Sequence, residues 1–208
     1  MNTDTSGPLV ALTFDDGPAD QCSTLLDILA AEGVHATFFL IGSRAAESPS
    51  LVRHIADAGH AIGNHTFTHP HLTTLNPAEQ ATEIDRCDEA IVAAGAERPR
   101  LCRPPFGEYD AVTLSLLASR GKVAVMWDVD TEDWSMHSAQ ETRERARGAR
   151  DGSVILMHDF PPHTSEALPD IIAEFKGRHA RFVTVPQLIE HAASVRPGAV
   201  VYSRYDIR

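Results

Sequence analysis

LVALTFDDGP, residues 9–18, begins the first of the strand-and-helix units that recur along the rest of the chain. The run LVALTF is short, apolar and rich in β-forming residues, which predicts a buried strand that ends at the Gly17-Pro18 turn. Apolar residues then recur at helical spacing over 22–32, and this segment ends at Gly33. A buried strand followed by a helix is the building unit of an α/β fold.

The alternation of strand and helix continues to the end of the chain. Further strands are predicted at 35–42, 61–66, 100–103, 123–127, 153–158 and 181–185, and helices at 50–58, 77–94, about 109–119, 138–149, about 166–176 and from Pro186 onward. No Pro/Ser-rich linker and no internal repeat divides the sequence, so we predict one catalytic domain over residues 1–208. Such alternation implies a parallel sheet, either open or closed into a barrel, and periodicity does not distinguish the two.

The composition narrows the classes of partner. Lysine and arginine number 18 against 29 acidic residues, so the net charge is 18 − 29 = −11. This charge argues against binding to nucleic acid or to an anionic membrane, and it favours a neutral substrate over a polyanion. No apolar run approaches the roughly 18 residues that would span a bilayer.

Two features bear on the cellular compartment. The start, MNTDTSGPLV, lacks the basic and apolar regions of a signal peptide, so we expect a cytoplasmic protein if the sequence is complete and an extracellular one if a leader has been trimmed. The three cysteines are too few for a disulfide framework and form no CxxC pair. Free buried thiols are expected, and a single Cys87–Cys102 bridge stays open.

Chemically active side chains gather at the carboxyl ends of the predicted strands. These residues are Asp15, Asp16, His65, His69, Arg103, Asp130, Asp133 and His158. In parallel α/β folds, active sites assemble at that edge of the sheet. The sequence therefore predicts that side chains from five strand ends converge on one site.

Part of this set is typical of a catalytic metal site. HTFTH, residues 65–69, places two histidines four apart, where both rings can reach one ion. Taken alone, the histidines could be solvated in a loop and Asp15-Asp16 could form an ordinary turn. Taken together, Asp16, His65 and His69 give three ligands with open positions, which suits Zn²⁺, with Co²⁺ or Ni²⁺ as alternatives.

Five motifs in order make the chain resemble the polysaccharide deacetylase (NodB-homology) family, of the carbohydrate esterase family 4 type. They are TFDDGP (13–18), HTFTH (65–69), RPPFG (103–107), DTEDW (130–134) and LMH (156–158), within a similarity that runs from about residue 8 to residue 190. The resemblance implies a distorted (β/α) barrel with seven or eight parallel strands. It also implies a bound divalent metal and hydrolysis of acetyl groups on sugars.

Hydrolysis of an amide needs a base, a stabiliser for the oxyanion and a proton for the leaving amine. Asp15 is the candidate base, and the guanidinium of Arg103 would keep it ionised. Because Pro104 and Pro105 have no N–H, the first free amide after Arg103 belongs to Phe106. We expect this amide to hold the oxyanion and to contact the substrate.

The proton for the leaving amine is assigned to His158. Its pKa should be raised for that role, and Asp133 is the expected partner. Alternatively, Asp133 caps a loop and His158 is a core histidine. Trp134 and Leu156 are expected to line the acetyl pocket. Alternatively, Trp134 is a residue of the hydrophobic core.

Three functions remain open at this stage. The first is metal-dependent removal of acetyl from N-acetylated sugars, such as GlcNAc-containing oligosaccharides or polysaccharides. The second is a related amidohydrolase acting on a non-sugar amide, or an O-acetyl esterase of the acetylxylan type. The third is an inactive carbohydrate-binding protein on the same scaffold. The sequence does not predict the oligomeric state.

Overall fold

The computed structural model describes residues 7–135, 138–190, 192 and 195–208. His137 and His191, to which the sequence assigned no role, and residues 1–6 at the start of the chain lie outside this part.

Seven strands form a closed ring. In order around the ring they are β1 (Leu9–Gly17), β2 (Thr37–Leu40), β3 (Ala61–Asn64), β4 (Leu101–Cys102), β5 (Val123–Val125), β9 (Val200–Ser203) and β7 (Ser153–His158), which returns to β1. Neighbours in the ring pair in parallel, except that β9 meets β7 antiparallel, through Ser203 and Ser153. The predicted α/β barrel is therefore confirmed, with closure by one C-terminal strand of the opposite sense to β7.

One strand prediction needs correction, and one strand of the ring was not predicted. The strand expected at 181–185 is the short β8 (Arg181–Phe182), which pairs with β1 outside the ring. The ring strand in its place is β9, which the sequence did not predict because the chain from Pro186 onward was assigned to a final helix. Two further short strands lie beside the ring: β6 (Val129–Asp130) pairs with β7, and β10 (Asp206–Ile207) pairs with β9.

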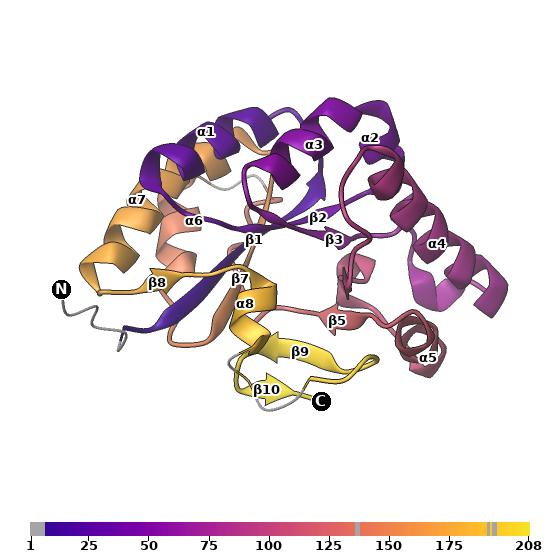
Figure 1. Ribbon diagram of the computed structural model, residues 1–208. Coiled ribbons are helices and arrows are strands. Elements are labelled where there is room, and N and C mark those ends of the chain that lie inside the picture. Colours follow the sequence, from indigo (N-terminus) through magenta and orange to yellow (C-terminus); the bar gives the residue numbers. More distant parts are fainter. Residues whose placement is uncertain (1–6, 136–137, 191, 193–194) are drawn as a thin grey trace.

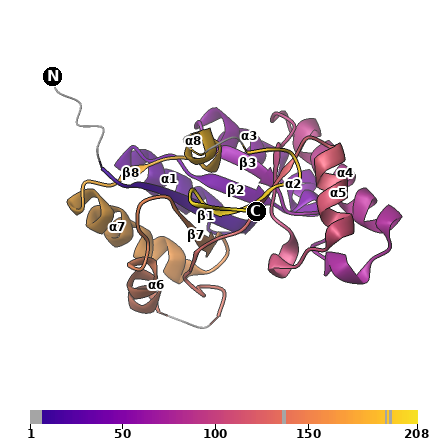
Figure 2. The same ribbon diagram turned by 90° about the horizontal axis from the view of Figure 1, so that it is seen from below.

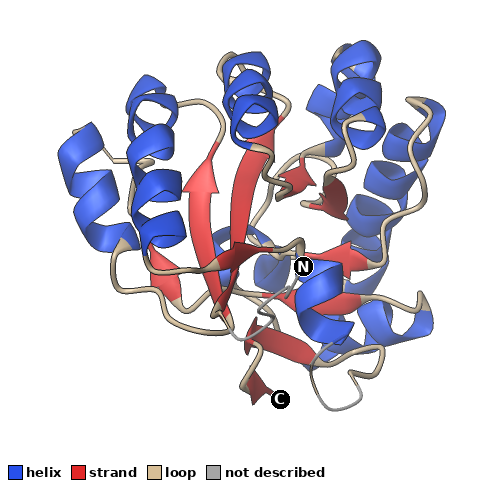
Figure 3. Ribbon diagram, turned by 60° about the vertical axis from the view of Figure 1, so that its left-hand side comes forward, coloured by secondary structure: helices blue, strands red, loops and turns tan. Residues whose placement is uncertain are grey.

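Most of the helices cover the outside of the ring, and the last one, α8 (Val185–Glu190), packs at the end where β3, β4 and β5 begin (Figure 1, Figure 3). The helices are α1 (Cys22–Glu32), α2 (Gly42–Glu47), α3 (Pro49–Asp57), α4 (Pro77–Ala93), α5 (Ala111–Ser119), α6 (Ala139–Ala146), α7 (Pro162–Gly177) and α8. In two views, α4 and α5 lie together on one side and α6 and α7 on the other (Figure 1, Figure 2). Capping boxes fix the starts of α4, α5 and α6.

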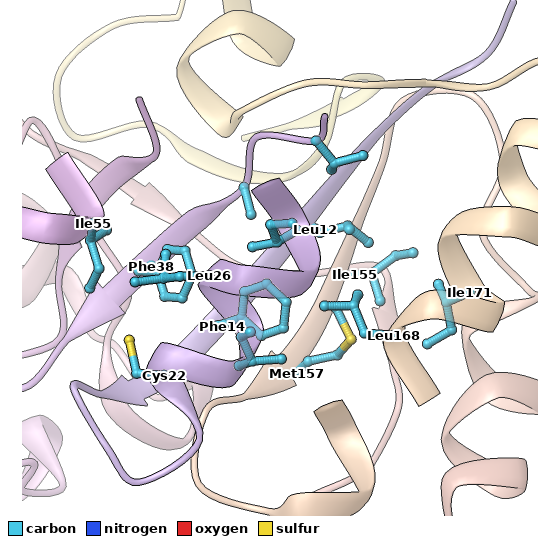
Figure 4. Packing of buried hydrophobic residues seen from close by; sticks show 14 of the residues in the cluster. Leu12, Phe14, Cys22, Leu26, Phe38, Ile55, Ile155, Met157, Leu168 and Ile171 are labelled. Carbon is cyan, nitrogen blue, oxygen red and sulfur yellow. The ribbon is translucent and has the colours of Figure 1, made fainter. Parts of the chain in front are cut away.

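Alternation along β1 determines which side chains face the helices. Leu12 and Phe14 pack in one apolar cluster with Ile155 and Met157 of β7 and with residues of α1 and α7 (Figure 4). Leu9 and Ala11 belong to a second cluster with residues of β2, β4, β5, β7 and β9, which can meet only inside the ring. Because successive side chains of a strand alternate, Asp15 lies on this inner side, in register with His158 of β7.

The three cysteines are buried free thiols, as expected, and the Cys87–Cys102 bridge is not formed. No helix in the described ranges is both long and apolar enough to cross a bilayer.

Candidate active site

The carboxyl ends of the ring strands open into a cavity of about 450 Å³. Its walls are Asp15, Asp16, His65, His69, Pro104, Phe106, Trp127, Asp130, Trp134, Leu156, His158 and Phe160. Arg103 and Asp133 lie behind the walls, each fully buried. All the predicted site residues are thus brought to one end of the barrel. A larger cavity, of about 670 Å³, lies at the opposite end, where β3, β4 and β5 begin.

Asp16, His65 and His69 form a cluster suited to a cation. Their ligand atoms all lie within 4.8 Å of one another, and Asp16 Oδ1 is 3.3 Å from His65 Nε2 and 3.2 Å from His69 Nε2. Asp16 Oδ1 is buried and has no hydrogen-bond partner in the described part of the chain. A buried carboxylate oxygen without a donor is costly, and a bound cation would remove that cost. The donor set therefore fits a divalent metal.

The protonation states in the cluster also suit a metal, which needs a carboxylate and neutral imidazoles. Burial raises the pKa of Asp16, but the close approach of His65 and the nearby positive charges outweigh it and bring the pKa to about 2. Burial, with the charge of His65, lowers the pKa of His69. His65 Nδ1 donates to the Arg103 carbonyl at 2.6 Å, which leaves His65 Nε2 as the atom that can bind a metal.

The backbone at these ligands is strained. Asp16, Thr66 and His69 are non-glycine residues with positive φ, at 71°, 65° and 62°. Each such residue costs about 1–3 kcal/mol and persists only where its surroundings enforce it. Part of the restraint comes from α2, which the sequence did not predict. Arg44 donates to the Asp16 carbonyl at 2.6 Å, and the first amide of this helix, Gly42 N–H, donates to the Thr66 carbonyl at 2.9 Å.

Asp15 is held by Arg103 and is distinct from the metal cluster. Arg103 Nη1 donates to Asp15 Oδ1 at 2.7 Å and to Thr13 Oγ1 at 2.8 Å. The other guanidinium nitrogens donate to the carbonyls of Val125 and Met126, at 3.0 and 2.9 Å. Because its charge is paired and it makes four hydrogen bonds, the guanidinium of Arg103 can be fully buried. It fixes the position of the Asp15 carboxylate.

His158 and Asp133 form a second ion pair across the cavity. His158 Nδ1 donates to Asp133 Oδ1 at 2.7 Å, so Nε2 is the ring atom left for a substrate. Burial lowers the pKa of His158, but the hydrogen bond and charge of Asp133 outweigh it, so the net shift is upward. Asp133 also accepts from Thr164 Oγ1 at 2.6 Å, and its carbonyl lies 2.6 Å from His163 Nε2. Sequence reasoning missed both partners, which follow His158 at the start of α7.

Aromatic residues surround the mouth of the cavity. Trp134 is 58% exposed and Phe106 is 54% exposed, so Trp134 is not a core residue. Leu156 is buried, in register with Thr13 beside Asp15. Phe106 has φ 60°, and its ring stacks on His71 with centroids 3.9 Å apart. The sequence did not single out Trp127 as part of the cavity wall.

Asp159 is a buried acid that sequence analysis missed. Its Oδ2 accepts from the Ala19 amide at 3.1 Å beneath the Asp16-Gly17 turn, and burial raises its pKa to about 7. A Cβ on Gly17 would lie 2.1 Å from that oxygen, so only glycine allows this close approach. Its position directly after His158 in the sequence was the signal that could have marked Asp159 as part of the site.

With this geometry in place, comparison with known proteins identifies the family. The family model described as polysaccharide deacetylase matches residues 2–125, more than half of the 208 residues. The chain belongs to the polysaccharide deacetylase family. This confirms the resemblance inferred from the five motifs and the prediction that the protein is a deacetylase of the hydrolase class.

Named relatives in the polysaccharide deacetylase family include a peptidoglycan-N-acetylglucosamine deacetylase of Bacillus cereus. The two are 39% identical over 195 residues, which is 89% of this chain and 71% of that protein. A chitooligosaccharide deacetylase of Bradyrhizobium is 35% identical over 192 residues, 90% of this chain and 88% of that protein. Some of the other curated relatives are longer, and the chain spans less than half of their length.

The fold agrees with a solved structure of the same family. A family 4 carbohydrate esterase from Streptomyces lividans, in complex with acetate, is 41% identical, with a TM-score of 0.85. The match covers 91% of this chain and 98% of that one.

Proposed function

We propose that this protein is a metal-dependent deacetylase that hydrolyses the N-acetyl groups of sugars in GlcNAc-containing oligosaccharides or polysaccharides. The observation that supports it most directly is the buried, unpartnered Asp16 Oδ1 between two histidine nitrogens, with a second carboxylate, Asp15, beside it. The substrates named for the Bacillus and Bradyrhizobium relatives support the sugar class.

Asp16, His65 and His69 would hold the metal, and Zn²⁺ fits one carboxylate and two imidazoles best. Co²⁺ and Ni²⁺ remain alternatives. When bound, the ion supplies Lewis acidity toward the acetyl carbonyl and toward water.

Asp15 is placed to take a proton from the attacking water, because its carboxylate faces the cavity and Arg103 fixes it from behind. The oxygen of that water forms the new bond to the acetyl carbon. Phe106 lines the same cavity, and its backbone N–H has no acceptor among the described residues, so this N–H is the candidate donor to the oxyanion that develops.

His158 supplies the proton that releases the amine. Its Nε2 faces the cavity while Nδ1 is engaged by Asp133, so the C–N bond can break as nitrogen is protonated and acetate is left behind. An ester oxygen is a better leaving group and depends less on this proton. The raised pKa of His158 therefore favours an amide over an O-acetyl ester.

Trp134 and Leu156 line the cavity and would enclose the acetyl methyl group. A small apolar wall of this kind selects acetyl over longer acyl groups by roughly 1–3 kcal/mol per extra methylene.

Acetate release tests the function. The panel comprises chitooligosaccharides, a peptidoglycan fragment, acetylxylan and small N-acetyl amides, and we expect release from the N-acetylated sugars. Faster release from acetylxylan or from the small amides would favour the esterase or the non-sugar amidohydrolase. No release from any compound would indicate an inactive carbohydrate-binding protein.

Metal dependence is tested separately. A chelator should stop acetate release, and Zn²⁺ or Co²⁺ should restore it. His65→Ala should lose bound metal by elemental analysis, whereas His54→Ala, at an exposed position on α3, should retain it. Release that is indifferent to chelation would contradict the metal-dependent mechanism.

A further inference from the structure

In the loop that joins the two candidate metal histidines, two backbone amides donate to a side chain of α4. Glu83 of α4 accepts from Phe67 N–H and Thr68 N–H with one oxygen, Oε2, at 2.9 and 2.8 Å. Its other oxygen, Oε1, accepts from Thr68 Oγ1 at 2.9 Å. One carboxylate therefore accepts three hydrogen bonds from Phe67 and Thr68, the two residues that lie between Thr66 and His69.

The loop needs this support because two of its residues have a strained backbone conformation. Thr66 and His69 have the left-handed backbone that costs non-glycine residues energy. With the chain turned in this way, the amides of Phe67 and Thr68 point to a side chain of another element and not to a neighbouring strand. The conformation brings the rings of His65 and His69 to a centroid separation of 4.9 Å, both facing Asp16.

Helix α4 is itself fixed at the end of β3. Asn64 Nδ2 donates to the carbonyl of Ile84 at 2.8 Å and to Asp88 Oδ1 at 2.7 Å. Asp88 is buried and is paired with the buried Lys122 at 2.8 Å. Because Glu83 precedes this anchored turn, its carboxylate has a defined position relative to the residue just before His65.

We propose that Glu83 is a positioning residue of the metal centre, which pre-forms the arrangement of His65 and His69 and thereby sets the affinity for the metal. The inference rests on the proposed function only through the metal site. Glu83 is not itself a ligand, because both of its oxygens are occupied by the loop. Groups that orient metal ligands in this way typically change metal affinity by 10–100-fold when they are removed.

The experiment measures Zn²⁺ affinity by competition with a chromophoric chelator, on metal-free protein and with no substrate present. Glu83→Ala should bind Zn²⁺ roughly 10–100-fold more weakly than the parent. Glu83→Gln keeps one acceptor oxygen and should lose less. Glu89→Ala, at an exposed position of the same helix, is the matched control and should bind as the parent does.

Thermal unfolding of the metal-free variants separates positioning from general stability. Weaker binding by variants that remain folded at the assay temperature supports the proposal. Parental affinity in folded Glu83→Ala overturns it and leaves the proposed metal site intact. If Glu83→Ala does not fold, Glu83→Gln decides, and parental affinity there overturns the proposal. Failure of the parent itself to bind Zn²⁺ would overturn both the metal site and the role of Glu83.

Discussion

Asp15 and Asp16 are neighbours in sequence, but their carboxylates face different partners. Asp15 points into the ring and pairs with Arg103, whereas Asp16 has a left-handed backbone and points to two imidazoles. Asp15→Asn should therefore abolish turnover, with a loss of roughly 10²–10⁴-fold, because a general base is removed. Bound metal should stay, since the ligand set is intact. Acetate release and elemental analysis on the same sample measure the two quantities.

Asp16→Asn is the matched control for Asp15→Asn. It should lose metal as well as activity, because the amide offers no charge to the cation. If Asp15→Asn released acetate at the parental rate, or lost its metal as Asp16→Asn does, the division of labour between the two carboxylates would be wrong.

The pairing of His158 with Asp133 predicts a pH dependence. The pKa of His158 is raised, so its acid form is populated at low pH and is lost as pH rises through that pKa. The rate should accordingly fall on the alkaline side of the profile. In Asp133→Asn the hydrogen bond and charge that raise the pKa are gone, while the burial that lowers it remains, so this alkaline limb should move to lower pH. The pH profile of kcat measures the shift.

Asp20→Asn removes an exposed carboxylate from the same end of β1 and serves as the control, for which no shift is expected. An alkaline limb that stays in place in Asp133→Asn would mean that another group supplies the proton.

At the scale of elements, β3 tolerates no side chain at Gly63. A Cβ there would lie 2.3 Å from the ring of Phe39, which is fully buried and lies 4.2 Å beneath the Arg103 guanidinium. Gly63→Ala should force Phe39 toward Arg103 and destabilise the fold by about 1–3 kcal/mol. At roughly 2–4 °C per kcal/mol, the thermal midpoint should fall by several degrees.

The control for that substitution is Gly177→Ala, at the end of α7, where a Cβ meets no atom within 4 Å. It should leave the midpoint unchanged or raise it slightly, because alanine favours helix. Equal midpoints for the two variants would show that β2 and β3 can separate without cost.

The elements that could be predicted from sequence are those with a local signal. LVALTF gave β1, and Gly33 and Pro77 marked the end of α1 and the start of α4. The short α2 was missed, since its six residues have no side-chain cap. Asp16, His65 and His69 were predicted to meet because parallel strands end at one edge. Glu83 and Arg44 were not, because their roles come from contacts between distant segments that leave no local pattern. The assigned catalytic roles and the single-domain organisation stay predictions.

At the scale of the whole molecule, the site depends on how the barrel closes. Met126 N–H donates to the carbonyl of Val201 in β9 at 2.7 Å, and the carbonyl of Met126 accepts from Arg103. Arg103 in turn holds Asp15. The last ring strand is thus linked to the candidate base through Met126 and Arg103, which directly follow β5 and β4.

Truncation after Gly198 should therefore affect both stability and activity. It removes β9 and β10, including the buried Val200 and Val201, whose burial contributes about 1.5–3 kcal/mol each. A loss of about 3 kcal/mol or more should lower the thermal midpoint by roughly 10 °C. Below the new midpoint, kcat should still be reduced, because β9 no longer restrains Met126, whose carbonyl accepts from Arg103. Truncation after Tyr205 keeps β9 and should cost much less. A protein ending at Gly198 that melted at the parental temperature with parental kcat would show that the six remaining ring strands already fix Arg103, and that β9 only covers the barrel.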